Sequence, residues 1–160
     1  MSKKAEKQAE SDVKIIATNR KARRDYEVLQ TFEAGLTLLG SEVKSLRAGK
    51  ANLKDAYAIP RGNEIFLLNM HISPYDKTGH SGHDPERQRK LLLHAREISK
   101  LISMVDEKGM TLIPLRLYFR GKYAKIELGV CRGKRAHDKR AAIIERDTKR
   151  DMEREMKRRQ

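Results

Sequence analysis

The stretch TLIPLRLYFRGKYAKIELGV, residues 111–130, decides the expected fold. Apolar residues occupy every second position on each side of the turn-like Arg120-Gly121-Lys122: Ile113, Leu115, Leu117 and Phe119 before it, and Ala124, Ile126, Leu128 and Val130 after it. Alternation of this kind is typical of strands that bury one face, and a short glycine-containing break between two such runs is typical of a β-hairpin. The sequence therefore predicts that Thr111–Phe119 and Tyr123–Val130 pair as a hairpin.

Shorter strand patterns precede this hairpin. We expect strands at residues 15–19, around Tyr26, Val28 and Phe32, and at residues 56–59 and 64–69, with a turn at residues 60–63. Five or six antiparallel strands with two or three helices predict a mainly β fold, a small OB-type barrel that carries a basic C-terminal tail. An open α+β sandwich is the alternative.

Two helices are expected inside this domain. The first opens at residues 40–42, with Ser41 as its N-cap and Gly49 as its stop. The second spans roughly residues 86–107, after a loop at residues 73–86, and closes at Gly109.

The composition changes after residue 131. Residues 132–160 hold 12 Lys and Arg against 6 Asp and Glu, with few apolar residues to pack. Such a segment cannot bury enough surface to offset its ordering entropy. Glu145 and Lys149, like two later pairs, are nevertheless spaced i,i+4 with the acid on the N-terminal side, which is the order that stabilises a helix. We expect a disordered N-terminus at residues 1–14, a β-barrel domain at 15–132, and a tail at 133–160 that is disordered when free and helical against a polyanion.

The net charge of +14 on 160 residues points to a nucleic acid or an anionic membrane as the partner. No run approaches the roughly 20 apolar residues of a membrane span. The single cysteine, Cys131, excludes an internal disulfide and suits a reducing cytosol, and we expect it to be buried.

Cations gather at two places in the predicted domain. Arg20, Lys21 and Arg23 follow Asn19, while Lys44, Arg47 and Lys50 share one face of the first helix. Either set would contact phosphates in a nucleic-acid complex, although a solvated surface is the alternative reading. Tyr118 and Tyr123 fall on the polar phases of the hairpin, so we expect both to be exposed and available for base stacking.

Enzyme chemistry is not expected. His80, His83 and Asp84 share a glycine-containing loop, but a zinc site usually needs further ligands at set spacings. The sequence contains no phosphate-binding glycine loop and no nucleophile elbow. We therefore expect no catalytic residues, no metal and no cofactor.

Five segments resemble, in order and spacing, the bacterial SsrA-binding protein family: TNRKAR at residues 18–23, FEAGL at 32–36, GSEVKSLR at 40–47, RKLLLH at 89–94 and HDKR at 137–140. The resemblance implies an OB-type barrel that binds transfer-messenger RNA and delivers it to stalled ribosomes in trans-translation. It implies a cytoplasmic protein without a membrane partner, which we expect to be a monomer.

The resemblance also implies roles for individual residues. Together with the cations above, it predicts an RNA-binding surface made of Asn19, Arg20, Lys21, Arg23, Glu33, Lys44, Arg47, Lys50, Lys90, Leu92 and Lys134. Glu33 would accept hydrogen bonds from base amino groups or ribose hydroxyls. His137, Asp138, Lys139 and Arg140 would act at the ribosomal decoding site beside small-subunit RNA, with the tail helical in the empty mRNA channel.

Two other functions remain open at this stage. A general ribosome-associated or single-strand RNA-binding protein could use the same barrel, and it would bind unstructured RNA equally well. An RNA-processing enzyme would reveal itself by cleaving RNA in the presence of Mg²⁺.

Overall fold

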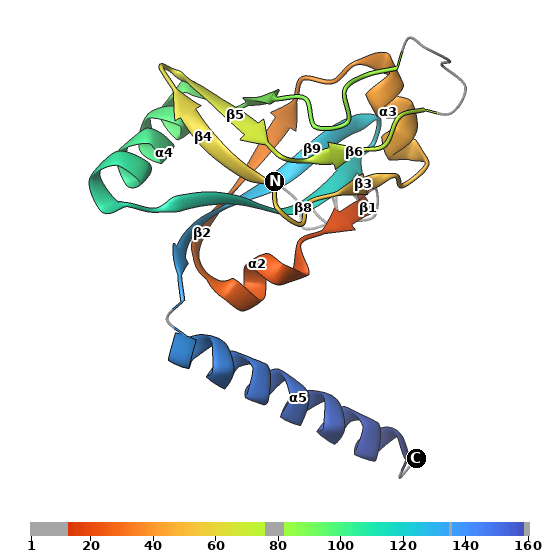
Figure 1. The fold of residues 1–160 in the computed structure, drawn as a ribbon, viewed down its shortest axis with the longest axis vertical. Helices are drawn as coiled ribbons and strands as arrows, with labels where there is room; N and C mark the ends of the chain where they lie inside the picture. Colours follow the sequence, from red (N-terminus) through yellow and green to blue (C-terminus); the bar gives the residue numbers. More distant parts are fainter. Residues whose placement is uncertain (1–12, 76–81, 135, 159–160) are drawn as a thin grey trace, which may run out of the picture.

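The computed structural model describes residues 13–75, 82–134 and 136–158 (Figure 1). Those residues form nine strands and four helices. The strands are β1 (Val13–Thr18), β2 (Tyr26–Leu36), β3 (Ala51–Asn52), β4 (Tyr57–Arg61), β5 (Glu64–Leu68), β6 (His71–Ile72), β7 (Arg89–Leu92), β8 (Thr111–Arg120) and β9 (Tyr123–Gly133). The helices are α2 (Arg20–Asp25), α3 (Gly40–Arg47), α4 (Ala95–Lys108) and α5 (Ala136–Arg158).

Six of these strands close into a ring. The order runs β8, β4, β5, β7, β2 and β9, and β9 pairs back onto β8. Every one of these pairings is antiparallel. β1 adds to β8, and the short strands β3 and β6 pair separately. The mainly β, antiparallel architecture predicted from the sequence is confirmed, with more strands than expected, and the closed ring is OB-like. The three helices before the tail agree with the prediction of two or three.

The β8–β9 hairpin forms as predicted, with one irregularity that its alternation did not reveal. The register of β8 shifts between Pro114 and Arg116, as at a β-bulge. A bulge reverses which side chains face inward. After it, Leu117 and Phe119 enter the main core with Ile126; before it, Leu112 does so instead.

The residues on the other side of β8 build a second, smaller core. Ile113 and Leu115 pack there with Ala22 of α2 and with Cys131, which is fully buried. Burial raises the pKa of the Cys131 thiol to about 11. The prediction of a buried cysteine is thus confirmed, and its high pKa makes it a poor nucleophile at neutral pH.

The helix predicted at residues 86–107 is wrong in its first part. The chain forms strand β7 at Arg89–Leu92, and α4 begins only at Ala95. Within β7, Arg89 and Leu91 are buried while Leu92 is exposed, so the period there is that of a strand. The end of the helix is as expected, because Gly109 caps it in the left-handed conformation with a φ of 61°.

Two helices complete the main core. Leu46 of α3 and Leu101 of α4 are fully buried in it, and Figure 1 shows these helices on opposite sides of the strands.

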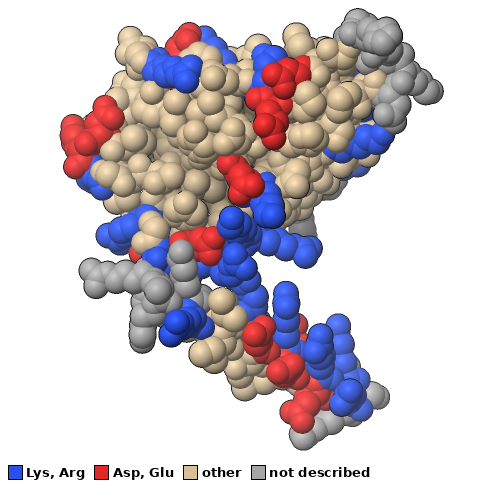
Figure 2. All heavy atoms as spheres, viewed as in Figure 1, with Lys and Arg blue, Asp and Glu red and all other residues tan. Residues whose placement is uncertain are grey.

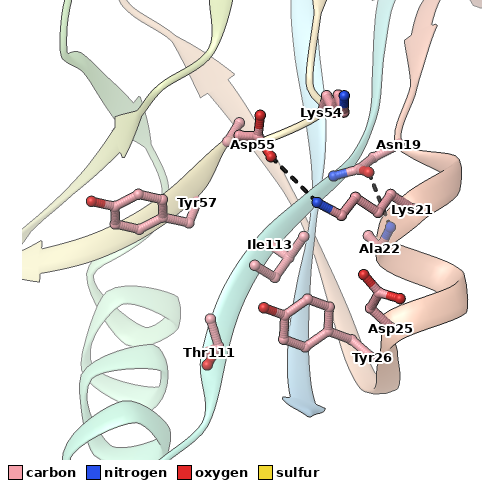
Figure 3. Close-up of a pocket in the computed structure, with 11 residues that line it drawn as sticks. Asn19, Lys21, Ala22, Asp25, Tyr26, Lys54, Asp55, Tyr57, Thr111 and Ile113 are labelled. Carbon is pink, nitrogen blue, oxygen red and sulfur yellow. Dashed lines mark hydrogen bonds and ion pairs between the residues drawn. The ribbon is translucent and has the colours of Figure 1, made fainter. Parts of the chain in front are cut away.

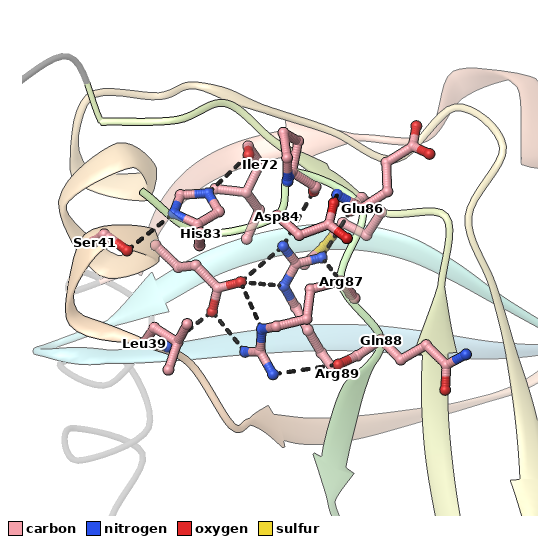
Figure 4. Close-up of polar contacts among 12 residues, drawn as sticks. Leu39, Ser41, Ile72, His83, Asp84, Glu86, Arg87, Gln88 and Arg89 are labelled. Atoms are coloured by element: carbon pink, nitrogen blue, oxygen red, sulfur yellow. Dashed lines mark hydrogen bonds and ion pairs between the residues drawn. The ribbon is translucent and has the colours of Figure 1, made fainter. Parts of the chain in front are cut away.

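α3 begins at Gly40 with Leu39 as its N-cap, so the prediction of Ser41 as the cap is wrong. The Ser41 hydroxyl instead lies 2.9 Å from Nδ1 of His83, whose Nε2 lies 2.9 Å from the Ile72 carbonyl oxygen (Figure 4).

A buried ion network ties α3 to the segment before and within β7 (Figure 4). The Glu42 side chain is fully buried and accepts hydrogen bonds from Nη2 of Arg87 at 2.8 Å and from Nε of Arg89 at 2.9 Å. It also accepts from the Leu39 amide at 2.8 Å. Arg89 is itself fully buried and donates to the carbonyls of Met70, Pro85 and Arg87.

The ionised form of Glu42 dominates despite its burial. Burial alone raises the pKa of the carboxyl, but the hydrogen bonds from Arg87 and Leu39 and the charge of Arg89 outweigh it, so the pKa lies below its ordinary value. A group whose pKa falls on folding stabilises the protein above its unfolded-state pKa, about 4.3 for Glu. That contribution is lost as the pH falls through the folded-state value.

Replacing this carboxylate should therefore destabilise the protein most at neutral pH. We expect Glu42→Gln to lower the free energy of unfolding by about 3 kcal/mol at pH 7, since it leaves a buried guanidinium uncompensated. The deficit should shrink as the pH falls below the unfolded-state pKa of about 4.3, because the unfolded wild-type chain then binds a proton at Glu42 before the folded protein does. Urea unfolding at both pH values measures it, with the exposed carboxylate of Glu86 changed in Glu86→Gln as the control. Equal stability of Glu42→Gln and wild type at pH 7 would contradict the role given to Glu42.

Candidate nucleic-acid interface

Basic side chains are concentrated at one edge of the barrel. Figure 2 shows Lys and Arg gathered over α2 and the end of β9, and again along α5, where acidic side chains lie between them. Arg20, Lys21, Arg23 and Arg132 are all exposed in this region. A surface of this kind suits a polyanion, because each cation can neutralise a phosphate.

α2 is fixed by the residue that precedes it. Asn19 is the N-cap: its Oδ1 accepts from the Ala22 amide at 3.0 Å, while its Nδ2 donates to the carbonyls of Leu53 at 3.2 Å and Pro114 at 3.1 Å. Its relative exposure is 3 %. The side chain of Asn19 thus lies within the scaffold rather than on the surface with the cations of α2, and it orients the helix that carries them.

A pocket of about 270 Å³ lies between α2 and the start of β4 (Figure 3). Tyr26 and Tyr57 line it together with Lys21, whose Nζ lies 3.5 Å from the carboxylate of Asp55. Two phenol rings beside a cation and a carboxylate are groups that can stack on an unpaired base and hydrogen-bond to its edge. Sequence reasoning did not find this pocket, because its walls come from distant segments.

Lys134 joins the tail to this edge of the barrel. Its backbone amide donates to the Asp25 carbonyl at 3.0 Å, and its Nζ lies 3.4 Å from the Arg23 carbonyl oxygen. β9 continues to Gly133, and Lys134 still contacts α2. The barrel therefore extends about two residues beyond the boundary expected at residue 132. Lys134 and the cations of α2 are the predicted residues that the fold brings closest to the tail.

Glu33 and Leu92 form a second group, on β2 and β7. Both line a shallow depression of about 430 Å³ together with Lys125 and His94. Leu92 is 52 % exposed although it is a large apolar residue. Lys90, on the same strand, pairs with Glu64 of β5.

The cations of α3 form a third group. Lys44 and Arg47 are exposed, and Nζ of Lys44 lies 5.4 Å from the centre of the Tyr75 ring. Lys50, just beyond the helix, is also exposed and has an interaction of its own. Figure 1 places α3 away from α2, so the predicted binding residues divide into three groups on one small barrel.

The two hairpin tyrosines differ from each other. Tyr123 is 62 % exposed, as predicted, whereas the prediction of an exposed Tyr118 is wrong, because Tyr118 is only 5 % exposed. The guanidinium groups of Arg116 and Arg120 lie 5.8 and 5.9 Å from its ring centre. Burial, followed by the hydrogen bond to Glu33, raises the pKa of the Tyr118 hydroxyl to about 12.

The histidine loop does not assemble a metal site within the described part of the chain. No cluster of three potential ligands occurs among those residues, and His83 is engaged by Ser41 and Ile72. His80 lies outside the described residues. No helix among residues 13–75, 82–134 and 136–158 is both long and apolar enough to cross a membrane.

The residues predicted for the decoding site all belong to α5. His137, Asp138 and Lys139 fall in its first turn or just after it, and Arg140 is exposed. The side chains of the first three lie outside the described part of the structure. Figure 1 shows α5 extending away from the barrel beyond α2.

Comparisons with known proteins agree on one family. A family model described as SmpB protein matches residues 16–158. An SsrA-binding protein of Microcystis aeruginosa is 56 % identical over 147 residues, which cover 91 % of this chain and 96 % of that relative. One from Gloeobacter violaceus is 57 % identical over 145 residues, covering 91 % of this chain and 95 % of the relative.

A solved structure is also similar. It is described as "tmRNA-SmpB: a journey to the center of the bacterial ribosome" and superposes with a TM-score of 0.64 at 48 % sequence identity. The match covers 78 % of this chain and 86 % of that one.

The geometry of Asn19 predicts a stability defect on its substitution. Asn19→Ala should lower the free energy of unfolding by about 3 kcal/mol, because it removes a helix cap and the two buried hydrogen bonds from Nδ2 to the carbonyls of Leu53 and Pro114. Arg20→Ala, on the exposed side of the same helix, should change it by no more than about 0.5 kcal/mol. Chemical denaturation measures both. An Asn19→Ala protein of normal stability that has lost RNA affinity would instead place this side chain on the RNA.

Proposed function

The chain belongs to the SmpB family of SsrA-binding proteins, and on that premise we propose how its surface binds transfer-messenger RNA and serves ribosome rescue. Members of this family are RNA-binding adaptors in trans-translation, not enzymes. The observation that carries the assignment is the family match over residues 16–158, which spans the barrel and most of the tail.

The barrel would hold the tRNA-like part of the RNA. Arg20, Lys21 and Arg23 supply phosphate contacts from α2, and Lys44 and Arg47 do so from α3. Lys134, Lys90 and Lys50 would each add a cation, to the α2 group, the Glu33 and Leu92 group and the α3 group, respectively. Contacts to phosphates fix position without reading sequence, so recognition requires other groups as well.

The depression around Glu33 and Leu92 is the part of the barrel suited to that recognition. The Glu33 carboxylate can accept hydrogen bonds from base amino groups or ribose hydroxyls, and the exposed Leu92 side chain offers an apolar contact beside it. Asn19 would contribute through the placement of α2.

The tail would act at the ribosome after the RNA is bound. The terminal segment expected at residues 1–14 ends earlier, because Val13 and Lys14 already pair with β8 in strand β1. The proposal therefore divides the chain into a terminal segment before Val13, an RNA-binding barrel to about Lys134 and a tail that is ordered by ribosomal RNA. His137, Asp138, Lys139 and Arg140 would lie at the decoding site, and the rest of α5 in the mRNA channel when no message fills it. A cytoplasmic, monomeric protein fits this role.

The RNA assignment is tested by comparing transfer-messenger RNA with ordinary tRNA of matched length in a gel shift. We expect tighter binding to transfer-messenger RNA, and no cleavage of either RNA in the presence of Mg²⁺. If about 5–8 phosphates are neutralised, log K against log salt should fall with a slope of about −4 to −7. Lys44→Ala and Arg47→Ala should each flatten that slope by about one.

Lys108→Ala is the matched control, since Lys108 is exposed at the end of α4 and belongs to none of the three groups. It should leave the slope unchanged. Equal affinity for unstructured RNA would favour a general RNA-binding protein, and a slope near zero would exclude a phosphate-dominated interface.

The division of labour between barrel and tail is tested by two further variants. Deleting residues 135–160 retains the Lys134 contacts to α2, so the thermal unfolding of the barrel and its RNA affinity should remain nearly intact. The triple variant Asp138→Ala, Lys139→Ala, Arg140→Ala should bind isolated transfer-messenger RNA within a factor of about three, because barrel phosphate contacts carry that binding. Both proteins should fail to support peptide tagging on stalled ribosomes. Tagging at the normal rate by the triple variant would overturn the role of these residues.

A further inference from the structure

Two carboxylates stand side by side on the barrel wall. Glu33 of β2 and Glu127 of β9 are direct cross-strand partners in the register of these strands. Like charges directly opposite each other destabilise a sheet, so this arrangement needs compensation. Strand β8 supplies it, because Arg120 pairs with Glu33 and Arg116 pairs with Glu127.

Tyr118 lies between the two arginines on β8. Their guanidinium groups approach its ring at 5.8 and 5.9 Å from the centre, and its hydroxyl donates to Oε2 of Glu33. Arg120 donates from Nη1 to Oε1 of Glu33 at 3.1 Å, and its Nη2 lies 3.0 Å from Oε2. Both oxygens of Glu33 therefore have a fixed partner.

The two carboxylates differ in access to solvent. The side chain of Glu33 is 34 % exposed and borders the depression that holds Leu92, whereas that of Glu127 is 17 % exposed. Because a carboxylate has about four acceptor sites, Glu33 can keep its partners on β8 and still accept from a ligand.

We propose that Tyr118 and Arg120 are positioning residues of the RNA interface, which hold Glu33 as an oriented, charge-compensated hydrogen-bond acceptor for a base amino group or a ribose hydroxyl. This inference rests on the proposed function, and specifically on the placement of Glu33 at the RNA.

Glu33 needs these partners because an unpaired carboxylate is unfavourable on a surface that binds RNA. An exposed carboxylate repels phosphates, and it rotates freely until a ligand orders it. The Arg120 partner offsets the charge, and the Tyr118 hydroxyl fixes the plane of the carboxylate. With its pKa raised to about 12, the Tyr118 hydroxyl remains a donor throughout the neutral range.

The experiment compares Glu33→Gln, Tyr118→Phe and the double variant of the full chain in binding to the tRNA-like part of transfer-messenger RNA. Glu33→Gln should weaken binding by about tenfold or more, as expected for a charge-assisted hydrogen bond. Tyr118→Phe, which retains the ring, should weaken it by about three- to tenfold. The double variant should bind within about twofold of Glu33→Gln, since the hydroxyl acts only through the carboxylate.

Two readouts separate positioning from a merely structural role. The slope of log K against log salt should be the same in all three variants and in wild type, because no phosphate contact is removed. In wild-type protein one tyrosine should titrate near pH 12 by its near-ultraviolet absorbance, and in Glu33→Gln that titration should move to lower pH. Tyr123→Phe, at the exposed tyrosine of the same hairpin, is the matched control: it removes only a hydroxyl and keeps the ring that could stack on a base, so it should bind like wild type.

The outcomes test three claims separately: that the protein binds the RNA, that Glu33 contacts it, and that Tyr118 positions Glu33. A wild-type protein that does not bind the RNA overturns the proposed function and this inference together. Normal binding by Glu33→Gln removes Glu33 from the interface while leaving RNA binding intact. Weak binding by Glu33→Gln with normal binding by Tyr118→Phe, or losses that add in the double variant, overturns the positioning role alone.

If Tyr118→Phe does not fold, variants of Arg120, the other partner of Glu33, test the proposal instead. Arg120→Lys keeps the charge beside Glu33, and Arg120→Gln removes it, at a side chain that is 49 % exposed. The lysine variant should retain more RNA affinity than the glutamine variant. Equal affinities of these two proteins would contradict the charge compensation.

Discussion

The arrangement of the barrel depends on one buried carboxylate, that of Glu42. It lies at the start of α3 and binds two guanidinium groups contributed by residues more than forty positions later, Arg87 and Arg89. Arg89 in turn donates to the carbonyls of Met70 and Pro85, so a single cluster joins α3, the end of the β5–β6 segment and the beginning of β7. Charged groups this deeply buried gain little net stability from their attraction, since desolvation opposes it. Their effect here is to specify geometry: Arg89 can reach Glu42 only if its side chain points into the barrel.

That constraint explains why the sequence predicted one segment wrongly. Residues 86–107 carry a helical pattern in their second half, which α4 follows from Ala95 onward. Residues 89–92 form a strand because β7 closes the ring between β5 and β2 and because Arg89 must be inside. Neither cause is local, so no window of the sequence contains it. The β8–β9 hairpin, by contrast, was predictable from alternation and a glycine turn alone. Only its bulge, which redirects Ile113 and Leu115 toward Ala22, depends on what packs from α2.

The residues of the candidate site also differ in whether local sequence could predict their placement. Exposed cations on α2 and α3 could be predicted from charge and spacing, because a solvated lysine or arginine needs no particular tertiary partner to remain exposed. Asn19 could not be distinguished from its basic neighbours in sequence, yet its amide bonds to Leu53 and Pro114 place it in the scaffold. Tyr118 was misjudged for a related reason. Strand alternation put it on the outer side, but the outer side is covered there by Arg116, Arg120 and Glu33, and the last of these is 85 residues away.

The barrel does not cover the apolar side chains described for the tail helix α5. Every α5 residue whose burial the structure describes is exposed, including Ile144, Met152 and Met156. A solitary helix gains nothing from its apolar side chains until something covers them, and 23 residues with weak apolar patterning are marginally helical in water. Its acidic residues lie between the basic ones, which favours helix formation through i,i+4 pairs without cancelling the net positive charge. The tail is thus suited to become a stable helix where phosphates meet its cations and where its Ile and Met side chains lose contact with water. Lys134, bonded to the end of α2, sets the point from which it extends, so the position of the RNA-bound barrel determines which surface the tail can reach.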